Sequence, residues 1–132
     1  MDKCIYSKYC GGCSMQGISY PKQLEMKQEH ALSLLKKFGN VEEIIGCKHP
    51  TNYRNKVQVS FGYDDKRRLI CGNYVSSTHM IVPIKECMIV DERANELIDS
   101  VLRIATKYKI SAFDEYSYKG CLRHLLIRTS NL

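Results

Sequence analysis

The sequence has no apolar run of the roughly 20 residues that a membrane-spanning helix needs. Its first residues, Met1 to Cys4, include no apolar segment of the kind found in secretion signals. Internal repeats, low-complexity segments and linkers rich in proline or glycine are also lacking. These absences argue against a membrane protein and a repeat protein, so we expect one cytoplasmic domain.

Cysteine and positive charge are the two features that stand out in the composition. The chain has seven cysteines in 132 residues, an odd number that does not suit a disulfide framework in a reducing compartment. Binding of a metal or a cluster is the favoured alternative. The net charge of +6 is compatible with a polyanionic partner, although many soluble proteins are equally basic.

Apolar spacing predicts an α+β fold with an antiparallel sheet of about four strands and two amphipathic helices. The helices are expected over 20–38 and from Asp91 to Tyr108, each with an apolar stripe in the core. The strands are expected over 53–63, 69–75, 80–84 and 122–127. In the first strand, one face should carry Val57, Val59, Phe61 and Tyr63, and the other Lys56, Gln58 and Ser60.

Three cysteines near the start, Cys4, Cys10 and Cys13, form the pattern C-x5-C-G-G-C. The glycines between Cys10 and Cys13 remove Cβ obstruction and leave backbone N–H groups free to point at sulfur. Three such thiolates could bind one face of an iron–sulfur cluster, which needs a fourth ligand from elsewhere in the chain. Cys87, between a strand and a helix, is one of several candidates. Zinc remains a competitor, but structural zinc usually takes two close cysteine pairs.

The loop motif and several later segments resemble the RNA uracil-C5 methyltransferases that carry a 4Fe–4S cluster. The matching segments follow the family's order and cover nearly the whole chain: Met15-Gln16 with Tyr20, Gln23 and Lys27; Tyr53-Arg54-Asn55-Lys56-Val57; Gly72-Asn73-Tyr74; Ser77-Thr78-His79; Ile84-Lys85-Glu86-Cys87; and the run from Gly120 to Arg128.

The resemblance implies a set of site residues. The cluster ligands would be Cys4, Cys10, Cys13 and Cys87, with Cys47, Cys71 and Cys121 as non-ligands. RNA contact would fall on Arg54 and Lys56. Residues 1–19 would form the cluster-binding loop, and residues 20–132 a fragment of the central α+β domain.

The resemblance also implies a function for the parent protein, methylation of carbon 5 of uridine in RNA, with ribosomal RNA as the expected substrate. A cysteine attacks carbon 6, S-adenosylmethionine supplies the methyl group, and a base removes the proton from carbon 5. No strand–Gly loop–helix unit that could hold S-adenosylmethionine occurs in this sequence. We therefore expect no catalytic or cofactor-binding residue in this chain, and no activity from it alone.

Two other functions stay open from the residues themselves. One is a non-enzymatic RNA-binding module with a zinc or iron–sulfur site. The other is a small ferredoxin-like electron carrier, which a basic, tyrosine-rich sheet does not favour. DNA and membranes are not expected as partners.

Overall fold

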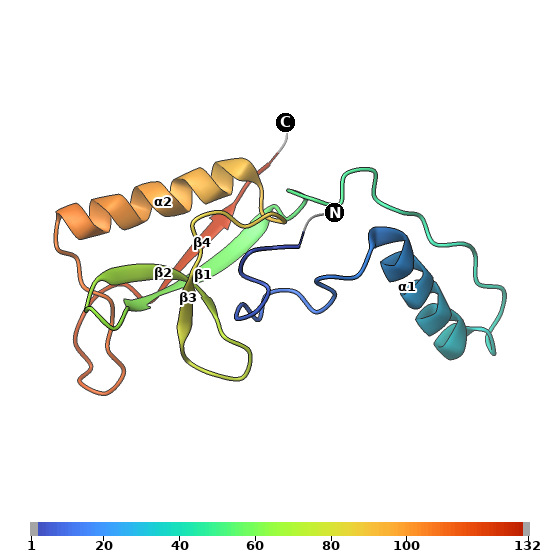
Figure 1. The fold of residues 1–132 in the computed structure, drawn as a ribbon, viewed down its shortest axis with the longest axis horizontal. Coiled ribbons are helices and arrows are strands. Elements are labelled where there is room, and N and C mark those ends of the chain that lie inside the picture. The colour runs from blue at the N-terminus through green and yellow to red at the C-terminus, as the bar shows by residue number, and fades with distance from the viewer. Residues whose placement is uncertain (1–2, 131–132) are drawn as a thin grey trace.

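The computed structural model describes residues 3–130. Met1 and Asp2, part of the segment inspected for a secretion signal, lie outside the described residues. One antiparallel sheet in the order β3-β2-β1-β4 and two helices confirm the predicted α+β class (Figure 1). The elements are α1 (Tyr20–Leu35), β1 (Lys56–Tyr63), β2 (Leu69–Tyr74), β3 (Ile81–Pro83), α2 (Glu92–Lys107) and β4 (His124–Arg128). Within residues 3–130, no helix is long and apolar enough to cross a membrane.

Strand β1 lies at the centre of the sheet, between β2 and β4. Val57, Val59 and Phe61 are buried on one face, as alternation predicted. Ser60, expected on the open polar face, is only 5% exposed. Its hydroxyl lies 3.1 Å from Nδ1 of His124 on β4, and this cross-strand hydrogen bond satisfies a polar group that the sequence pattern assigned to solvent.

Helix α2 covers the apolar face of the sheet, as Figure 1 shows. It begins after Asp91, whose side chain caps the helix by accepting a hydrogen bond from the N–H of Arg93 at 2.9 Å, so the helix begins where the sequence predicted. Ala94, Ile98 and Ala105 are buried along its inner face. Full burial of a side chain such as Ile98 stabilises the fold by about 1.5–3 kcal/mol.

Helix α1 differs from the prediction. It ends at Leu35, earlier than the expected residue 38, and none of its residues is buried. Figure 1 shows it standing apart from the sheet, and Phe38 just beyond it is 78% exposed. Its main neighbour is the following extended segment, to which Gln28 is bonded at Glu42 O (3.1 Å) and Ile44 N (2.7 Å). The expectation that this helix contributes core was therefore wrong, because periodicity identifies an apolar face but not what covers it.

The last strand also begins later than predicted. It starts at His124 and pairs with β1 from Lys56↔Arg128 to Ser60↔His124. Leu122 instead forms an isolated parallel bridge with Ala112. Cys121, which precedes this strand, is exposed.

Candidate functional site

The N-terminal loop is fastened to the rest of the fold at several points. Cys10 forms an isolated antiparallel bridge with Val75, just after β2. The hydroxyl of Tyr6 accepts a hydrogen bond from the N–H of Lys85 at 3.2 Å. These contacts bring the loop against two segments far from it in sequence, so the loop is part of the folded body.

Gln16 adds a further connection between the loop and the segment after β3. Its Oε1 accepts from the N–H of Cys4 at 3.3 Å, and its Nε2 lies 3.5 Å from the sulfur of Met88. One side chain thus links the backbone of the first loop cysteine to the residue after Cys87.

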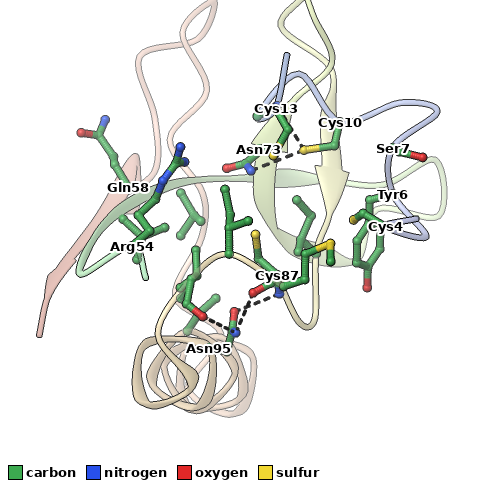
Figure 2. A pocket seen from close by; sticks show the side chains of 18 of the residues that line it. Cys4, Tyr6, Ser7, Cys10, Cys13, Arg54, Gln58, Asn73, Cys87 and Asn95 are labelled. Carbon is green, nitrogen blue, oxygen red and sulfur yellow. Dashed lines mark hydrogen bonds between the residues drawn. The ribbon is translucent and has the colours of Figure 1, made fainter. Parts of the chain in front are cut away.

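The four predicted ligands, Cys4, Cys10, Cys13 and Cys87, all line one cavity of about 130 Å³. Figure 2 shows them reaching this cavity from the N-terminal loop and from the segment that precedes α2. Each of the four is partly buried and none forms a disulfide. The structure therefore brings together thiols that the sequence holds far apart.

The remaining cysteines lie outside this cavity. Cys71 is 2% exposed in the core, and burial raises the pKa of its thiol to about 12. Cys47 and Cys121 are exposed.

Cys10 receives two hydrogen bonds on its sulfur. The N–H of Gly12 donates to it at 3.4 Å, and Nδ2 of Asn73 on β2 donates at 3.5 Å. A Cβ on Gly12 would lie only 3.2 Å from Nδ2 of Asn73, so glycine keeps this approach open. The N–H of Gly11 donates instead to the carbonyl of Tyr74 at 3.1 Å. Hydrogen-bond donors to the sulfur atoms are also a feature of protein iron–sulfur sites.

Cys87 lies in a short turn in which the N–H of Val90 donates to its carbonyl at 3.1 Å. Burial raises the pKa of the Cys87 thiol, while the backbone N–H groups of Ile89 and Val90 act in the opposite direction. Negative charge on Cys13 and on Cys4 raises this pKa further. Such like-charge repulsion operates between groups that share a site, and a bound cation would reverse it.

The thiols surround a space and do not meet at a point. Within residues 3–130, no three His, Cys, Asp or Glu side chains are placed to hold a single metal ion. Tetrahedral zinc needs its sulfur ligands about 2.3 Å from one centre. An iron–sulfur cluster is also held by four cysteine thiolates, but these bind different irons and enclose a larger group. An all-sulfur donor set that lines one cavity is compatible with the ligand chemistry of such a cluster.

The two predicted RNA-binding residues lie beside this cavity. Arg54 is half-buried and Lys56 is exposed at the start of β1, and both contribute to the cavity wall. The backbone of Arg54 is bonded to the segment that follows Cys87: its N–H donates to Ile89 O at 2.8 Å, and its carbonyl accepts from Asp91 N at 3.1 Å. Among the ion pairs found within residues 3–130, none involves either residue.

Arg54 also lines a second, more open cleft of about 430 Å³. Cys13 and Gln16 belong to both walls, and Tyr53 and Lys27 contribute to this second cleft. Tyr53 is 58% exposed, which leaves much of its side chain accessible. The cleft therefore combines cationic, amide and aromatic groups next to the thiol-lined cavity.

Sequence reasoning missed the supporting residues Asn73, Asn95 and Gln16. Asn73 and Gln16 stand in segments that carry the family resemblance, which gave them no role. Asn95 carried a signal of its own, because it falls three residues before Ile98 on the face of α2 that is otherwise apolar. A polar residue on a buried helix face needs partners, and that need was the available clue.

Comparison with known proteins finds relatives that are named RNA methyltransferases. No family model matches it. It is 38% identical over 130 residues to a protein of Clostridium tetani, and 36% identical over 131 residues to one of Staphylococcus aureus, each named an uncharacterized RNA methyltransferase. Each match covers 96% of this chain. The chain spans only 28% and 29% of the length of these two relatives.

A solved structure shows the same fold. The chain superposes on the Pyrococcus abyssi tRNA (uracil-54, C5)-methyltransferase, crystallised with S-adenosyl-L-homocysteine, with a TM-score of 0.71 and 25% sequence identity. The match covers 90% of this chain and 28% of that one. These findings confirm the resemblance drawn from the sequence: the chain is homologous to a part of larger RNA methyltransferases.

Proposed function

We propose that this chain is the cluster-holding and RNA-binding part of an S-adenosylmethionine-dependent methyltransferase that modifies carbon 5 of uridine in RNA. The observation that carries the proposal is the cavity lined by Cys4, Cys10, Cys13 and Cys87, with Arg54 and Lys56 in its wall. Homology to RNA methyltransferases supports methyl transfer to RNA as the reaction class. The fold shared with a uracil-C5 methyltransferase supports uracil as the modified base and carbon 5 as the modified atom.

In this proposal the four cysteines hold a 4Fe–4S cluster. When bound, the cluster supplies iron–thiolate bonds that join the N-terminal loop to the segment before α2. Asn73 and the N–H of Gly12 already donate to one of the ligand sulfurs, as outer-shell groups do at iron–sulfur sites. The proposed role of the cluster is to stabilise the structure and to position RNA. Residues 1–19 would form the cluster-binding loop, and residues 20–132 would form the fragment of the central domain.

Arg54 and Lys56 would meet RNA phosphates, and the adjoining cleft would take part of the same strand. An exposed aromatic side chain such as Tyr53 offers a surface on which an unpaired base stacks. Uridine methylation at carbon 5 requires the target base to leave its stack, so an unpaired segment is the expected form of substrate. Ribosomal RNA stays our predicted substrate, and cytoplasmic location stays a prediction as well.

Iron content tests the cluster. Protein reconstituted anaerobically with iron and sulfide should hold one cluster, and iron should exceed zinc in elemental analysis. Cys87→Ala should lose iron as fully as Cys10→Ala, while the matched Cys47→Ala variant keeps it, because Cys47 is exposed outside the cavity. Full iron in Cys87→Ala would remove Cys87 from the ligand set, and zinc in place of iron would favour the RNA-binding module with a zinc site.

Methyl transfer tests the reaction. The parent protein, with the sequence that its relatives have beyond this part, should transfer labelled methyl from S-adenosylmethionine to carbon 5 of uridine. Ribosomal RNA and tRNA should be offered in parallel, since the solved relative is named for tRNA. Label on a base other than uridine would refute the proposed reaction, and label confined to tRNA would refute the ribosomal substrate.

A further inference from the structure

Asn95 is a buried polar residue on α2, only 8% exposed, with its amide directed at the turn that carries Cys87. Its Oδ1 accepts from the N–H of Cys87 at 3.1 Å. Its Nδ2 donates to the carbonyl of Cys87 at 3.1 Å and lies 3.5 Å from the carbonyl of Val90. Figure 2 draws these contacts beneath the cavity. One side chain therefore holds both backbone polar groups of Cys87.

The segment around Cys87 has little regular structure of its own. β3 ends at Pro83 and α2 begins at Glu92, so Cys87 lies in a connection between them. Helix α2, in contrast, is packed on the sheet through Ala94 and Ile98. Because the direction of a Cβ follows from the backbone, a side chain anchored in α2 that holds this backbone also sets where the sulfur points.

We infer that Asn95 is a positioning residue, which presents the Cys87 sulfur to the cluster from the rigid surface of α2. The inference rests on the proposed cluster function. Metal ligands in proteins are generally oriented by hydrogen bonds from neighbouring residues that do not themselves bind the metal. Asn95 would play this part for a cysteine ligand. Asn95 touches no metal in this scheme and acts through Cys87 alone.

Two variants separate the hydrogen bonds from the packing. Asn95→Asp keeps the shape and the acceptor for Cys87 N, but an ionised carboxylate cannot donate to the carbonyls of Cys87 and Val90. Asn95→Ala removes every bond. The matched control is Ala105→Gly, a buried site at the other end of the same helix, where glycine weakens α2 without approaching Cys87.

The readouts are the rate at which a chelator removes iron from the reconstituted protein and the electron paramagnetic resonance spectrum of its reduced cluster. Both Asn95 variants should release iron about 10-fold faster or more, in line with the loss of metal affinity that follows when a residue orienting a metal ligand is replaced, and should show a shifted spectrum. Ala105→Gly should leave the spectrum unchanged. Circular dichroism of the apo-proteins checks that each variant is folded, and Asn95→Asp serves if Asn95→Ala does not fold.

The outcomes are distinguishable. If both Asn95 variants match Ala105→Gly in iron release and spectrum, Asn95 has only a structural role and the inference is overturned, while the proposed cluster stands. If the unaltered chain takes up no cluster under anaerobic reconstitution, the proposed function itself fails and the inference fails with it.

Discussion

The salt dependence of RNA binding offers a quantitative test of the surface beside the cavity. Each RNA phosphate neutralised by a cation releases counterions, and for single strands the slope of log K against log salt changes by about 0.7 per contact. Arg54 and Lys56 lie in the wall of the same cavity, and none of the ion pairs found within residues 3–130 takes up their charge. If both meet phosphates, replacing both by alanine should make the slope shallower by about 1.4.

That change corresponds to a measurable affinity difference. Between about 50 mM and about 200 mM salt, the unaltered protein should lose roughly sevenfold more affinity than the Arg54→Ala, Lys56→Ala double variant. Fluorescence anisotropy with a labelled single-stranded RNA, repeated across this salt range, gives both slopes. The affinities at one salt concentration are insufficient, because any loss of positive charge weakens RNA binding in general.

A control with the same loss of charge separates contact from net charge. Lys107→Ala, Lys119→Ala removes two exposed lysines, and Lys107 lies at the far end of α2, about 24 Å along its axis from the end near Cys87. The control should keep the slope of the unaltered protein. Equal slopes for the unaltered protein and the Arg54→Ala, Lys56→Ala variant would refute the reasoning and place the RNA surface elsewhere.

Three further predictions concern the chain by itself. Incubated with labelled S-adenosylmethionine and uridine-containing RNA, it should incorporate no methyl group, because its sequence contains no strand–Gly loop–helix unit of the kind that holds this cofactor; any incorporation would contradict this. Iodoacetamide at neutral pH should modify Cys47 before Cys71 by mass spectrometry, because burial raises the pKa of Cys71 to about 12 and leaves little thiolate; early labelling of Cys71 would show that it is accessible. Gly72→Ala should lower the free energy of unfolding, measured with urea, by about 1–3 kcal/mol, because the new Cβ would clash with the carbonyl of Val82 on β3. The control Gly39→Ala should leave the free energy of unfolding nearly unchanged, because the space around Gly39 is open.

Several elements followed from the sequence because their determinants are local. Helix α2 has a capping aspartate and apolar residues at helical spacing, all within a few turns of one another. Strand β1 has the alternation that a half-buried strand requires. The clustering of Cys10 and Cys13 is equally local, since a tight turn with glycines brings two thiols close whatever the rest of the chain does.

Other features depended on contacts that no local pattern contains. Ser60 was expected on the polar face of its strand, but strand pairing places its hydroxyl within hydrogen-bonding distance of His124. Helix α1 has an apolar stripe, but none of its residues is buried against another part of residues 3–130. Whether such a stripe is buried depends on where the helix lies relative to the sheet, which the spacing of its own residues does not specify.

The candidate site divides in the same way. The sequence by itself determined that this chain is rich in thiols, that three of them form one loop, and that the whole resembles RNA methyltransferases. The resemblance named Cys87 as the fourth ligand, but only the tertiary structure shows that Cys87 lines the same cavity as that loop and that Asn95 holds its backbone. The physical reason is that residue spacing fixes the direction of a side chain within its own helix or turn. The meeting of two distant segments is fixed only when the sheet and α2 pack together.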